Sequence, residues 1–296
     1  MTKVEGAFQH LDVPVGFFST AKAIALRDGK HLGAPLAAPG TAAFRVAEDK
    51  QLTYRRSENL GIRVPGEFGE ALRSGDFDRP ALPVIAKLRH ERGGSTAEVI
   101  RDVPALRDHV STHTDQEYLY QEMVQGGGTL AHCGFFIDGQ PVAEFQHHEV
   151  RSVPRVGGSG TRLKSIRDTD LRDQSRKLLA DLSWTGLAQV EFKRSDSGEL
   201  TLMEINPKIW ASYALASRAG PPLVAIAARH AMERPLNELA ETPLKRMSMA
   251  FPLREALHIR RTKRYREIPA GFVSMLRPPV RWDVELRDLR GYLQSI

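Results

Sequence analysis

The sequence has a single cysteine, Cys133, among its 296 residues. One cysteine excludes an intrachain disulfide and a cysteine-rich metal site, and it makes the cytoplasm the expected compartment. No apolar run approaches the roughly 18 residues that a membrane-spanning helix requires. Residues 1–18 also lack the long apolar segment and the small-residue cleavage site of a secretion signal. We therefore expect a cytoplasmic protein with no membrane partner.

The chain has fewer acidic than basic residues. It contains 36 Asp and Glu and 42 Lys and Arg, which gives a formal net charge of +6. A mild basic excess is compatible with nucleic acid, an anionic membrane or anionic small molecules as partners. The densest basic stretch, residues 254–266, contains one aromatic residue, Tyr265, and no nucleic-acid-binding motif. We interpret it as a solvated helix face or loop and expect no nucleic-acid partner. A basic nucleic-acid binder that acts through this stretch stays open as an alternative.

The order of the expected elements indicates the fold class. Hydrophobic residues make up 41% of the chain, which is enough for a sizeable core. Periodicity and capping signals predict helices over residues 48–63, 168–182 and 222–233 and a short helix over 20–28. They also predict that residues 97–110 are helical at both ends of the segment. Alternation and turn signals predict strands over residues 80–88, 118–124, 129–137, 140–150, 187–194 and 200–206. Because strands and helices mix irregularly, we expect an α+β or α/β fold with mostly antiparallel sheets, and we favour α+β.

The strongest chemical signal is a predicted hairpin over residues 187–206 with a four-residue loop at 196–199. This loop places Glu191 opposite Glu204 and Gln189 opposite Asn206, and strand alternation puts all four on one face. The opposite face is apolar and suits a core. The other expected cross-strand pairs are Val190 with Ile205, Phe192 with Met203, and Ser195 with Leu200.

Two facing carboxylates need an explanation. Directly opposed Cβ atoms lie about 4.5–5.5 Å apart, and two carboxylates at 4 Å repel by about 4 kcal/mol at an effective dielectric near 20. Either one acid is protonated or a cation lies between them. Glu191, Glu204 and Asn206 form an all-oxygen donor set that suits Mg²⁺ bridging substrate phosphates. The alternative is a solvated hairpin face whose acids are neutralised by basic neighbours. Those neighbours would be Lys193, Arg194 or Lys208.

Two glycine-containing segments are candidate anion sites. Lys87 lies near the end of a predicted strand, just before a turn at residues 91–96. Glycines let the backbone approach a phosphate closely, although the spacing does not match a Walker A loop, and an ordinary loop is the alternative. Residues 155–160 form a second glycine-rich segment and a candidate flap. His147 and His148 point to opposite sides of a predicted strand, which argues against a shared metal site.

Taken in order, these segments resemble the ATP-grasp superfamily over residues 48–220, in the carboxylate–amine ligase branch that includes carbamoyl-phosphate synthetase. EDKQLTYRRSENLGIRVP is similar to the family's helix with the first ATP lysine. PVIAKLRHERGGST looks like the strand with the second lysine and the flexible glycine loop. YLYQEMVQGGG resembles the hinge strand, and VEFKRSDSGELTLMEINPK resembles the metal-binding hairpin. WASYALASRAG looks like the segment that follows the Asn-Pro-Arg of this branch.

The resemblance implies an ATP-grasp fold, in which two α+β subdomains grip ATP between them. The implied phosphate-binding residues are Lys50, Lys87 and the loop of Gly93, Gly94, Ser95 and Thr96. The implied adenine-binding residues are Glu122 and the backbone of Met123 and Val124. The implied ligands of two Mg²⁺ ions, which Mn²⁺ could replace, are Glu191, Glu204 and Asn206. The implied catalytic candidates for the transferred phosphoryl group or the substrate carboxylate are Lys208, Arg151 and Arg155.

The resemblance also implies a domain division. Residues 1–47 would be a remnant of the Rossmann-like domain that usually precedes this fold, with most of that domain absent. Residues 48–125 would form a linker helix and the lid subdomain, and residues 126–296 the C-terminal subdomain with the metal-binding hairpin. Two positions depart from the family pattern. Only Gly128 or Thr129 stands where an acid commonly holds the ribose, and Lys208 replaces an arginine, so bidentate recognition is lost.

The activity implied by the resemblance is an ATP- and Mg²⁺-dependent ligation. The γ-phosphoryl group passes to a small-molecule carboxylate, and an amine then displaces phosphate from the acyl phosphate. A homodimer is an open alternative to a monomer. Two further alternatives keep the fold: a kinase or carboxylase, and a nucleotide-binding module without catalysis.

Overall fold

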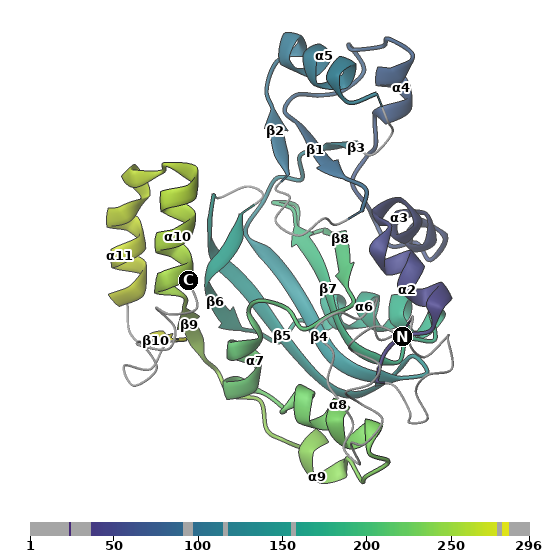
Figure 1. Cartoon of the computed structure of the whole chain (residues 1–296), viewed down its shortest axis with the longest axis vertical. Coiled ribbons are helices and arrows are strands. Elements are labelled where there is room, and N and C mark those ends of the chain that lie inside the picture. Colours follow the sequence, from purple (N-terminus) through teal and green to yellow (C-terminus); the bar gives the residue numbers. More distant parts are fainter. Residues whose placement is uncertain are drawn as a thin grey trace, which may run out of the picture.

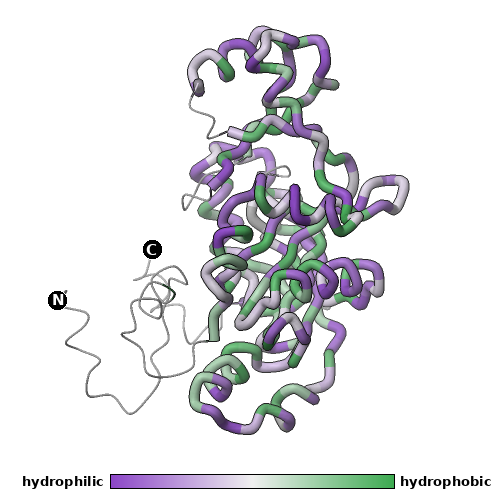
Figure 2. Tube along the Cα trace, turned by 90° about the vertical axis from the view of Figure 1, so that its right-hand side faces the viewer, coloured by the Kyte–Doolittle hydropathy of each residue, from purple (hydrophilic) through white to green (hydrophobic). Residues whose placement is uncertain are grey.

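The structure is a computed structural model that describes residues 24, 37–90, 97–114, 118–154, 158–276 and 280–283. Two parts are apparent in Figure 1: a small lobe over residues 67–122, and a large lobe built around one broad sheet over residues 129–283. Short apolar stretches alternate with polar ones along both lobes in Figure 2. Among the described residues, no helix has the length and apolar character to cross a bilayer.

The small lobe holds a three-stranded antiparallel sheet in the order β2-β1-β3. The strands are β1 (Val84–Leu88), β2 (Glu98–Ile100) and β3 (Tyr118–Glu122), and the helices are α4 (Gly69–Arg73) and α5 (Val103–Thr112). Leu72 and Leu106 from the two helices pack on Val84, Ala86 and Tyr120. This small core holds the strands in place beside the large lobe.

One helix prediction in the small lobe was wrong. Residues 98–100 form strand β2 and not the beginning of a helix. They pair with residues 84–86 of β1 in an antiparallel arrangement. The helix begins only after Asp102, whose side chain accepts a hydrogen bond from the backbone N–H of Ala105 at 2.9 Å. Pro104 in the first turn fits this start, since proline needs no hydrogen-bond partner there.

The large lobe contains a seven-stranded sheet in the order β10-β9-β6-β5-β4-β7-β8, antiparallel except for the β9–β10 pair. Its strands are β4 (Thr129–Ile137), β5 (Gln140–Val153), β6 (Ser159–Ser165), β7 (Gly186–Arg194), β8 (Leu200–Asn206), β9 (Ser248–Ala250) and β10 (Val280–Trp282). Asp138 and Gly139 have φ angles of 47° and 78°, so the predicted turn between β4 and β5 is confirmed. The mixed architecture confirms the expected α+β class.

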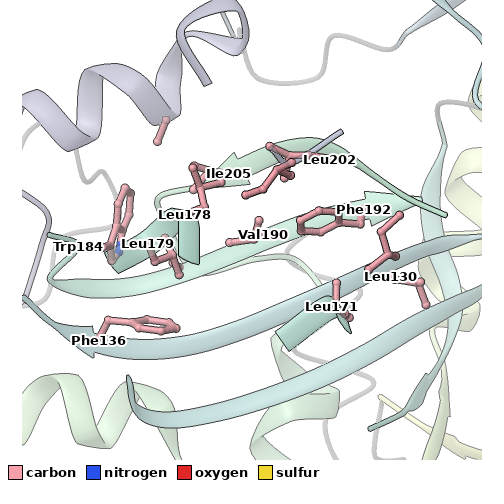
Figure 3. Packing of buried hydrophobic residues seen from close by; sticks show 14 of the residues in the cluster. Leu130, Phe136, Leu171, Leu178, Leu179, Trp184, Val190, Phe192, Leu202 and Ile205 are labelled. Atoms are coloured by element: carbon pink, nitrogen blue, oxygen red, sulfur yellow. The ribbon is translucent and has the colours of Figure 1, made fainter. Parts of the chain in front are cut away.

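Helices cover both faces of the large sheet. The helix α6 (Thr169–Asp181) packs Leu171, Leu178 and Leu179 on one face, where Val190 and Phe192 of β7 also point (Figure 3). On the other face lie the helices α7 (Tyr213–Ala219), α8 (Leu223–Ala231) and α9 (Asn237–Ala240). Because β7 buries one face in the α6 core, its alternate side chains are directed to the opposite face of the sheet.

Further helices lie beside the two outer parts of the large sheet. Near β8 lie α2 (Thr41–Glu48) and α3 (Lys50–Asn59), and near β6 lie α10 (Pro252–Thr262), a 3-10 turn (Tyr265–Glu267) and α11 (Ile268–Leu276). The predicted helix over 48–63 corresponds to α3, and Gly61 follows its end with a φ of 69°. The division into residues 1–47, 48–125 and 126–296 stays a prediction.

Candidate active site

The hairpin of β7 and β8 places the two predicted acids opposite each other. Glu191 pairs with Glu204, and Gln189 pairs with Asn206, as the sequence predicts. The predicted register is wrong nearer the loop, where Phe192 pairs with Leu202 and not with Met203. Arg194, and not Ser195, pairs with Leu200, because a β-bulge follows the acid pair.

The bulge changes the role of one residue. Leu202 takes the position in the α6 core that the sequence assigns to Met203. Met203 instead lines a cavity on the side of the acids. The Tyr54 hydroxyl from α3 donates a hydrogen bond to the Met203 carbonyl oxygen at 2.8 Å. The bulge therefore creates a contact between α3 and the hairpin that the sequence pattern does not reveal.

Polar groups surround the paired acids. The Asn206 amide nitrogen lies 3.3 Å from the Glu191 carboxylate and 3.2 Å from the Glu204 carboxylate, and it donates to both. The Lys50 ammonium lies 3.5 Å from the other oxygen of Glu204. Arg194 points elsewhere and binds Asp168 at 2.6 Å. Arg194, one of the residues expected to neutralise the acids, therefore pairs with a different carboxylate. Lys50, which was not among those residues, lies close to Glu204 instead.

A cavity of about 260 Å³ lies between the small lobe, α3 and the acid face of the hairpin. It brings together residues that are far apart in the sequence. The predicted site residues that line it are Lys50, Lys87, Glu122, Met123, Val124, Glu191 and Glu204. Residues that the sequence analysis did not assign also line it, including Pro65, Ile85, Leu88, Gln121, Ser152, Lys193 and Met203. Its walls therefore combine apolar side chains, cations and carboxylates.

Lys87 is the most perturbed cation of the cavity. Its ammonium donates to the Tyr54 hydroxyl at 2.6 Å. Burial lowers the pKa of Lys87 from its ordinary value of 10.5 to about 8, although the Glu204 and Glu191 carboxylates oppose this shift. Burial also raises the pKa of the Tyr54 hydroxyl. Tyr54 thus remains neutral and fixes the Lys87 ammonium near the acids.

The segment after β3 forms another wall. The backbone N–H of Glu122 donates to the Gly66 carbonyl oxygen at 2.9 Å. Its carboxylate accepts from the Gly66 N–H at 3.1 Å and lies 3.4 Å from the Arg63 guanidinium. These contacts fix the position at which Met123 and Val124 enter the cavity wall. Thr129, one of the two residues expected in place of the ribose-binding acid, also lines the cavity.

Two further ionisable residues lie near the acids: Lys193, which the sequence analysis named only as a possible neutralising neighbour, and Glu149, which it did not name. Lys193 lines the cavity, and burial together with the nearby charge of Lys87 lowers the pKa of its ammonium group. Burial raises the pKa of the Glu149 carboxyl to about 7, and the Glu204 carboxylate adds to this rise. Alternation along β7 could have pointed to Lys193, which lies two residues after Glu191. Glu149 carries no signal in the sequence, since its position depends on the pairing of β5 with β6.

Two of the three predicted catalytic candidates are not gathered at this cavity. Lys208 is exposed after the end of β8, and Arg151 forms ion pairs with Glu255 and Glu267 at 2.9 Å and 3.1 Å. In the described part of the chain, neither residue lines the cavity. Arg155 lies outside the described residues.

The two glycine segments are only partly described. The whole loop of Gly93, Gly94, Ser95 and Thr96 lies outside the described residues. In the other segment, residues 159–160 begin strand β6, so the predicted loop over 155–160 is wrong at its end. Gly158 just before that strand lines the cavity.

The donor set fits a hard divalent cation better than a transition metal. No group of three or more His, Cys, Asp or Glu residues is arranged to hold a metal in the described ranges. The set instead consists of two carboxylates and one amide, all able to offer oxygen ligands. Mg²⁺ is usually held by one or two carboxylates together with substrate phosphates. The geometry of the pair therefore suits an ion whose coordination is completed by a phosphorylated ligand.

Sequence comparisons agree with this arrangement. A family model for the carbamoyl-phosphate synthase L chain, ATP-binding domain, matches residues 155–239, which include the hairpin. The carbamoyl phosphate synthase large chain of Halobacterium salinarum is 25% identical over 240 residues, with 69% of this chain and 23% of that protein covered. The corresponding protein of Thermoplasma acidophilum is 24% identical, with 75% and 22% covered.

Solved structures agree with the fold. An N5-carboxyaminoimidazole ribonucleotide synthetase in its ADP complex superposes with a TM-score of 0.66 at 16% identity, covering 88% of this chain and 72% of that one. Biotin carboxylase from Campylobacter jejuni gives a TM-score of 0.61 at 14% identity, covering 78% and 56%. The chain has the ATP-grasp fold. The expected resemblance to the carbamoyl-phosphate-synthetase-like branch of ATP-grasp proteins is confirmed by the sequence similarity.

The chain spans less than a quarter of the length of the carbamoyl phosphate synthases that it matches. The family model that matches residues 155–239 describes the ATP-binding domain of the carbamoyl-phosphate synthase L chain. What these larger proteins do as a whole therefore does not transfer to this chain by similarity alone.

Proposed function

We propose that this ATP-grasp protein uses Mg²⁺ and ATP to activate a small-molecule carboxylate as an acyl phosphate and to join it to an amine. The observation that carries the proposal is the gathering of Glu191, Glu204, Lys50 and Lys87 around one cavity. These residues come from α3, β1 and the β7–β8 hairpin, so only the folded chain brings them together. Acids and lysines in one cavity fit a ligand that combines phosphates with divalent metal.

The lysines would bind the phosphates of ATP. Lys50 lies 3.5 Å from the Glu204 carboxylate, Lys87 feels the charge of both acids, and Lys193 adds a third cation to the cavity. The Tyr54 hydroxyl holds the Lys87 ammonium in place. The loop of residues 93–96 would close over the triphosphate and exclude water. Positioning and charge compensation are the main contributions that a protein makes to phosphoryl transfer.

Glu191, Glu204 and Asn206 would hold the metal. Bound Mg²⁺ would supply charge neutralisation for the phosphate oxygens during transfer. Asn206 donates a hydrogen bond to each acid and keeps the two carboxylates together. With metal present, we expect its amide to turn its oxygen toward the ion, since an amide nitrogen is no ligand.

The base and sugar of ATP would occupy the wall made by the small lobe and the hinge. Ile85, Leu88 and Met203 supply apolar surface there, while Glu122, Met123 and Val124 would contact the adenine. Gly128 and Thr129 stand where an acid commonly holds the ribose. We expect this exchange to weaken nucleotide affinity without preventing binding.

Product analysis and a substrate screen test the proposal. Purified protein is incubated with Mg²⁺, ATP and pools of amino acids paired with other carboxylates, and the release of ADP and phosphate is measured. We expect ADP release that depends on both an amine and a carboxylate. AMP and pyrophosphate as products would contradict the acyl-phosphate route.

A carboxylase is the second candidate, because the neighbours with similar folds include a biotin carboxylase and N5-carboxyaminoimidazole ribonucleotide synthetases. In that reaction bicarbonate would take the place of the organic carboxylate. ADP release that requires bicarbonate, and that is unchanged when other carboxylates are left out, would favour it. Nucleotide binding with no ADP release in any mixture would instead indicate a module without catalysis.

A further inference from the structure

The C-terminal helix pair exposes an unusual amount of apolar surface. Six of the eleven large apolar side chains that are exposed in the described chain come from residues 265–282. They are Tyr265, Ile268, Phe272, Val273, Leu276 and Trp282. Phe272 is 62% exposed and Leu276 is 56% exposed. Scattered single exposures are normal on a protein surface, but a contiguous apolar group marks an interaction site.

Three of these side chains share one face of α11. Ile268, Phe272 and Leu276 recur at intervals of four residues, which aligns them along one side of a helix. Gly271 on the other side is buried against the Glu255 carboxylate of α10. The Trp282 indole N–H donates to the Met275 carbonyl oxygen at 3.4 Å, so this tryptophan lies at the C-terminal end of α11. The result is a largely apolar helix that directs Ile268, Phe272 and Leu276 outward.

A group of basic residues, called the basic rim below, directly precedes the apolar helix in the chain. Its five exposed cations lie between the last turn of α10 and the start of α11: Arg260, Arg261, Lys263, Arg264 and Arg266. Residues 252–276 contain only two acids, Glu255 and Glu267, and both are ion-paired with Arg151. The rim therefore carries a concentrated positive charge that no acid of the same segment offsets.

We propose that this α10–α11 surface, defined as the six apolar residues of 265–282 and the five cations of 260–266, binds the surface of an anionic lipid bilayer. At a membrane interface, exposed apolar side chains enter the acyl region and neighbouring cations lie near anionic headgroups. Phenylalanine, leucine and tryptophan beside a cluster of arginines form such a surface. The proposal replaces the expectation that residues 254–266 are only a solvated face and that the protein has no membrane partner.

The charge pattern favours a membrane over a second copy of this chain. In a symmetric dimer the same surface meets itself, so both basic rims would enter one interface with no acid of this segment to offset their charge. An anionic bilayer neutralises the same cations. Figure 1 shows α11 as the outermost element at the edge of the large sheet beyond β6 and α10, away from α3 and the small lobe. Membrane binding through this surface would leave the cavity accessible.

Vesicle sedimentation tests the proposal. The full-length chain is mixed with vesicles of pure phosphatidylcholine or with vesicles that contain about 30% phosphatidylglycerol, and the pelleted fraction is measured at low and high salt. We expect binding to the anionic vesicles, and a decrease in binding as salt rises. Removal of one rim charge should weaken binding about five-fold, which corresponds to about 1 kcal/mol.

Two variants separate the apolar and the charged contributions. The double change Phe272→Ser and Leu276→Ser should weaken binding by about 20-fold, because two half-exposed apolar side chains no longer enter the acyl region. Arg261→Gln with Arg264→Gln should weaken it to a similar extent. The matched control is Val224→Ser with Arg234→Gln, which removes an exposed apolar side chain and an exposed charge near α8. Circular dichroism checks that each variant is folded.

Three outcomes would overturn the proposal. The first is equal binding to neutral and anionic vesicles, and the second is unchanged binding of both α10–α11 variants. The third combines two results: the protein does not pellet with vesicles, and analytical ultracentrifugation shows a concentration-dependent dimer. The variant with Phe272→Ser and Leu276→Ser would no longer form this dimer. That third result would assign the surface to a second copy of this chain. None of these measurements depends on the proposed catalytic activity.

Discussion

Replacing Glu204 by glutamine removes one charge from the facing acid pair with almost no change in shape. The side chain can still accept hydrogen bonds, and the β7–β8 register should persist. In the proposed function, the carboxylate is a metal ligand, and a neutral amide is a much poorer one. We therefore expect Mg²⁺-dependent ADP release to fall at least about 100-fold, a loss of about 3 kcal/mol in transition-state stabilisation.

The stability of the ligand-free protein should change far less. The variant loses the attraction between Glu204 and the Lys50 ammonium, which lies 3.5 Å away and is worth about 5 kcal/mol at an effective dielectric near 20. It also loses the repulsion from Glu191, about 3 kcal/mol for charges about 5 Å apart. Glu204 is 29% exposed, so solvent screens both interactions. We expect a net destabilisation of about 1 kcal/mol, or about 2 °C in Tm.

The assay pairs ADP release with thermal unfolding in the presence and absence of Mg–ATP. Saturating ligand should stabilise the original protein by about 3 kcal/mol, and this gain should disappear in the Glu204→Gln variant. The matched control is Glu199→Gln on the same hairpin. Glu199 is half-exposed and pairs with Arg63 outside the cavity. The control should keep both turnover and ligand stabilisation.

Two results would refute the reasoning. If Glu204→Gln retained full Mg²⁺-dependent turnover, the hairpin acids would not be the metal site. If the ligand-free variant lost as much stability as it lost activity, the acid would have a structural role. Asn206→Ala provides an independent check, because the proposed metal site predicts a loss of activity there as well.

Three further predictions concern other residues. Because Lys87 has a pKa of about 8, ATP should bind more weakly as pH rises above 8, and Lys87→Met should remove this dependence in calorimetry. In the ligand-free protein the unfolded chain binds more protons between about pH 8 and 10.5, so the free energy of unfolding should rise over this range in urea titrations. Arg151→Met should cost about 3–5 kcal/mol in urea unfolding, because it leaves a buried carboxylate unpaired. Loss of turnover without that instability would instead support the catalytic role expected from the sequence. Gly128→Ala should strongly lower Tm, since its Cβ would lie 1.7 Å from the Glu149 carbonyl oxygen, whereas Gly40→Ala has open space and should not.

The sequence was most informative where the constraints are local. The register of Glu191 with Glu204 follows from turn residues and from the two-residue alternation of strands, both of which operate within a short segment. The prediction failed only beyond the bulge, where Leu202 and not Met203 faces Phe192. A bulge depends on how the strand packs against α6 and α3, and alternation alone cannot locate it.

Contacts between distant segments could not be predicted in the same way. Tyr54 reaches the Met203 carbonyl oxygen across 149 positions of sequence, and Lys50 meets Glu204 across a similar separation. Lys50 and Lys87 were selected through the family resemblance, because a lysine carries no local sign of its role. Arg151 was selected on charge, but its guanidinium turns to Glu255, which approaches only after α10 packs beside β5.

The sequence by itself determined the α+β class and the acidic hairpin, and its order of motifs carried the resemblance to the ATP-grasp fold. These features are recorded in periodicity, turn chemistry and motif order, which the chain carries before it folds. Tertiary structure decided which charges share the cavity, which residue the bulge turns toward it, and where apolar side chains remain outside. Those outcomes depend on the pairing of distant strands and the docking of helices, because burial and electrostatic neighbours exist only in three dimensions.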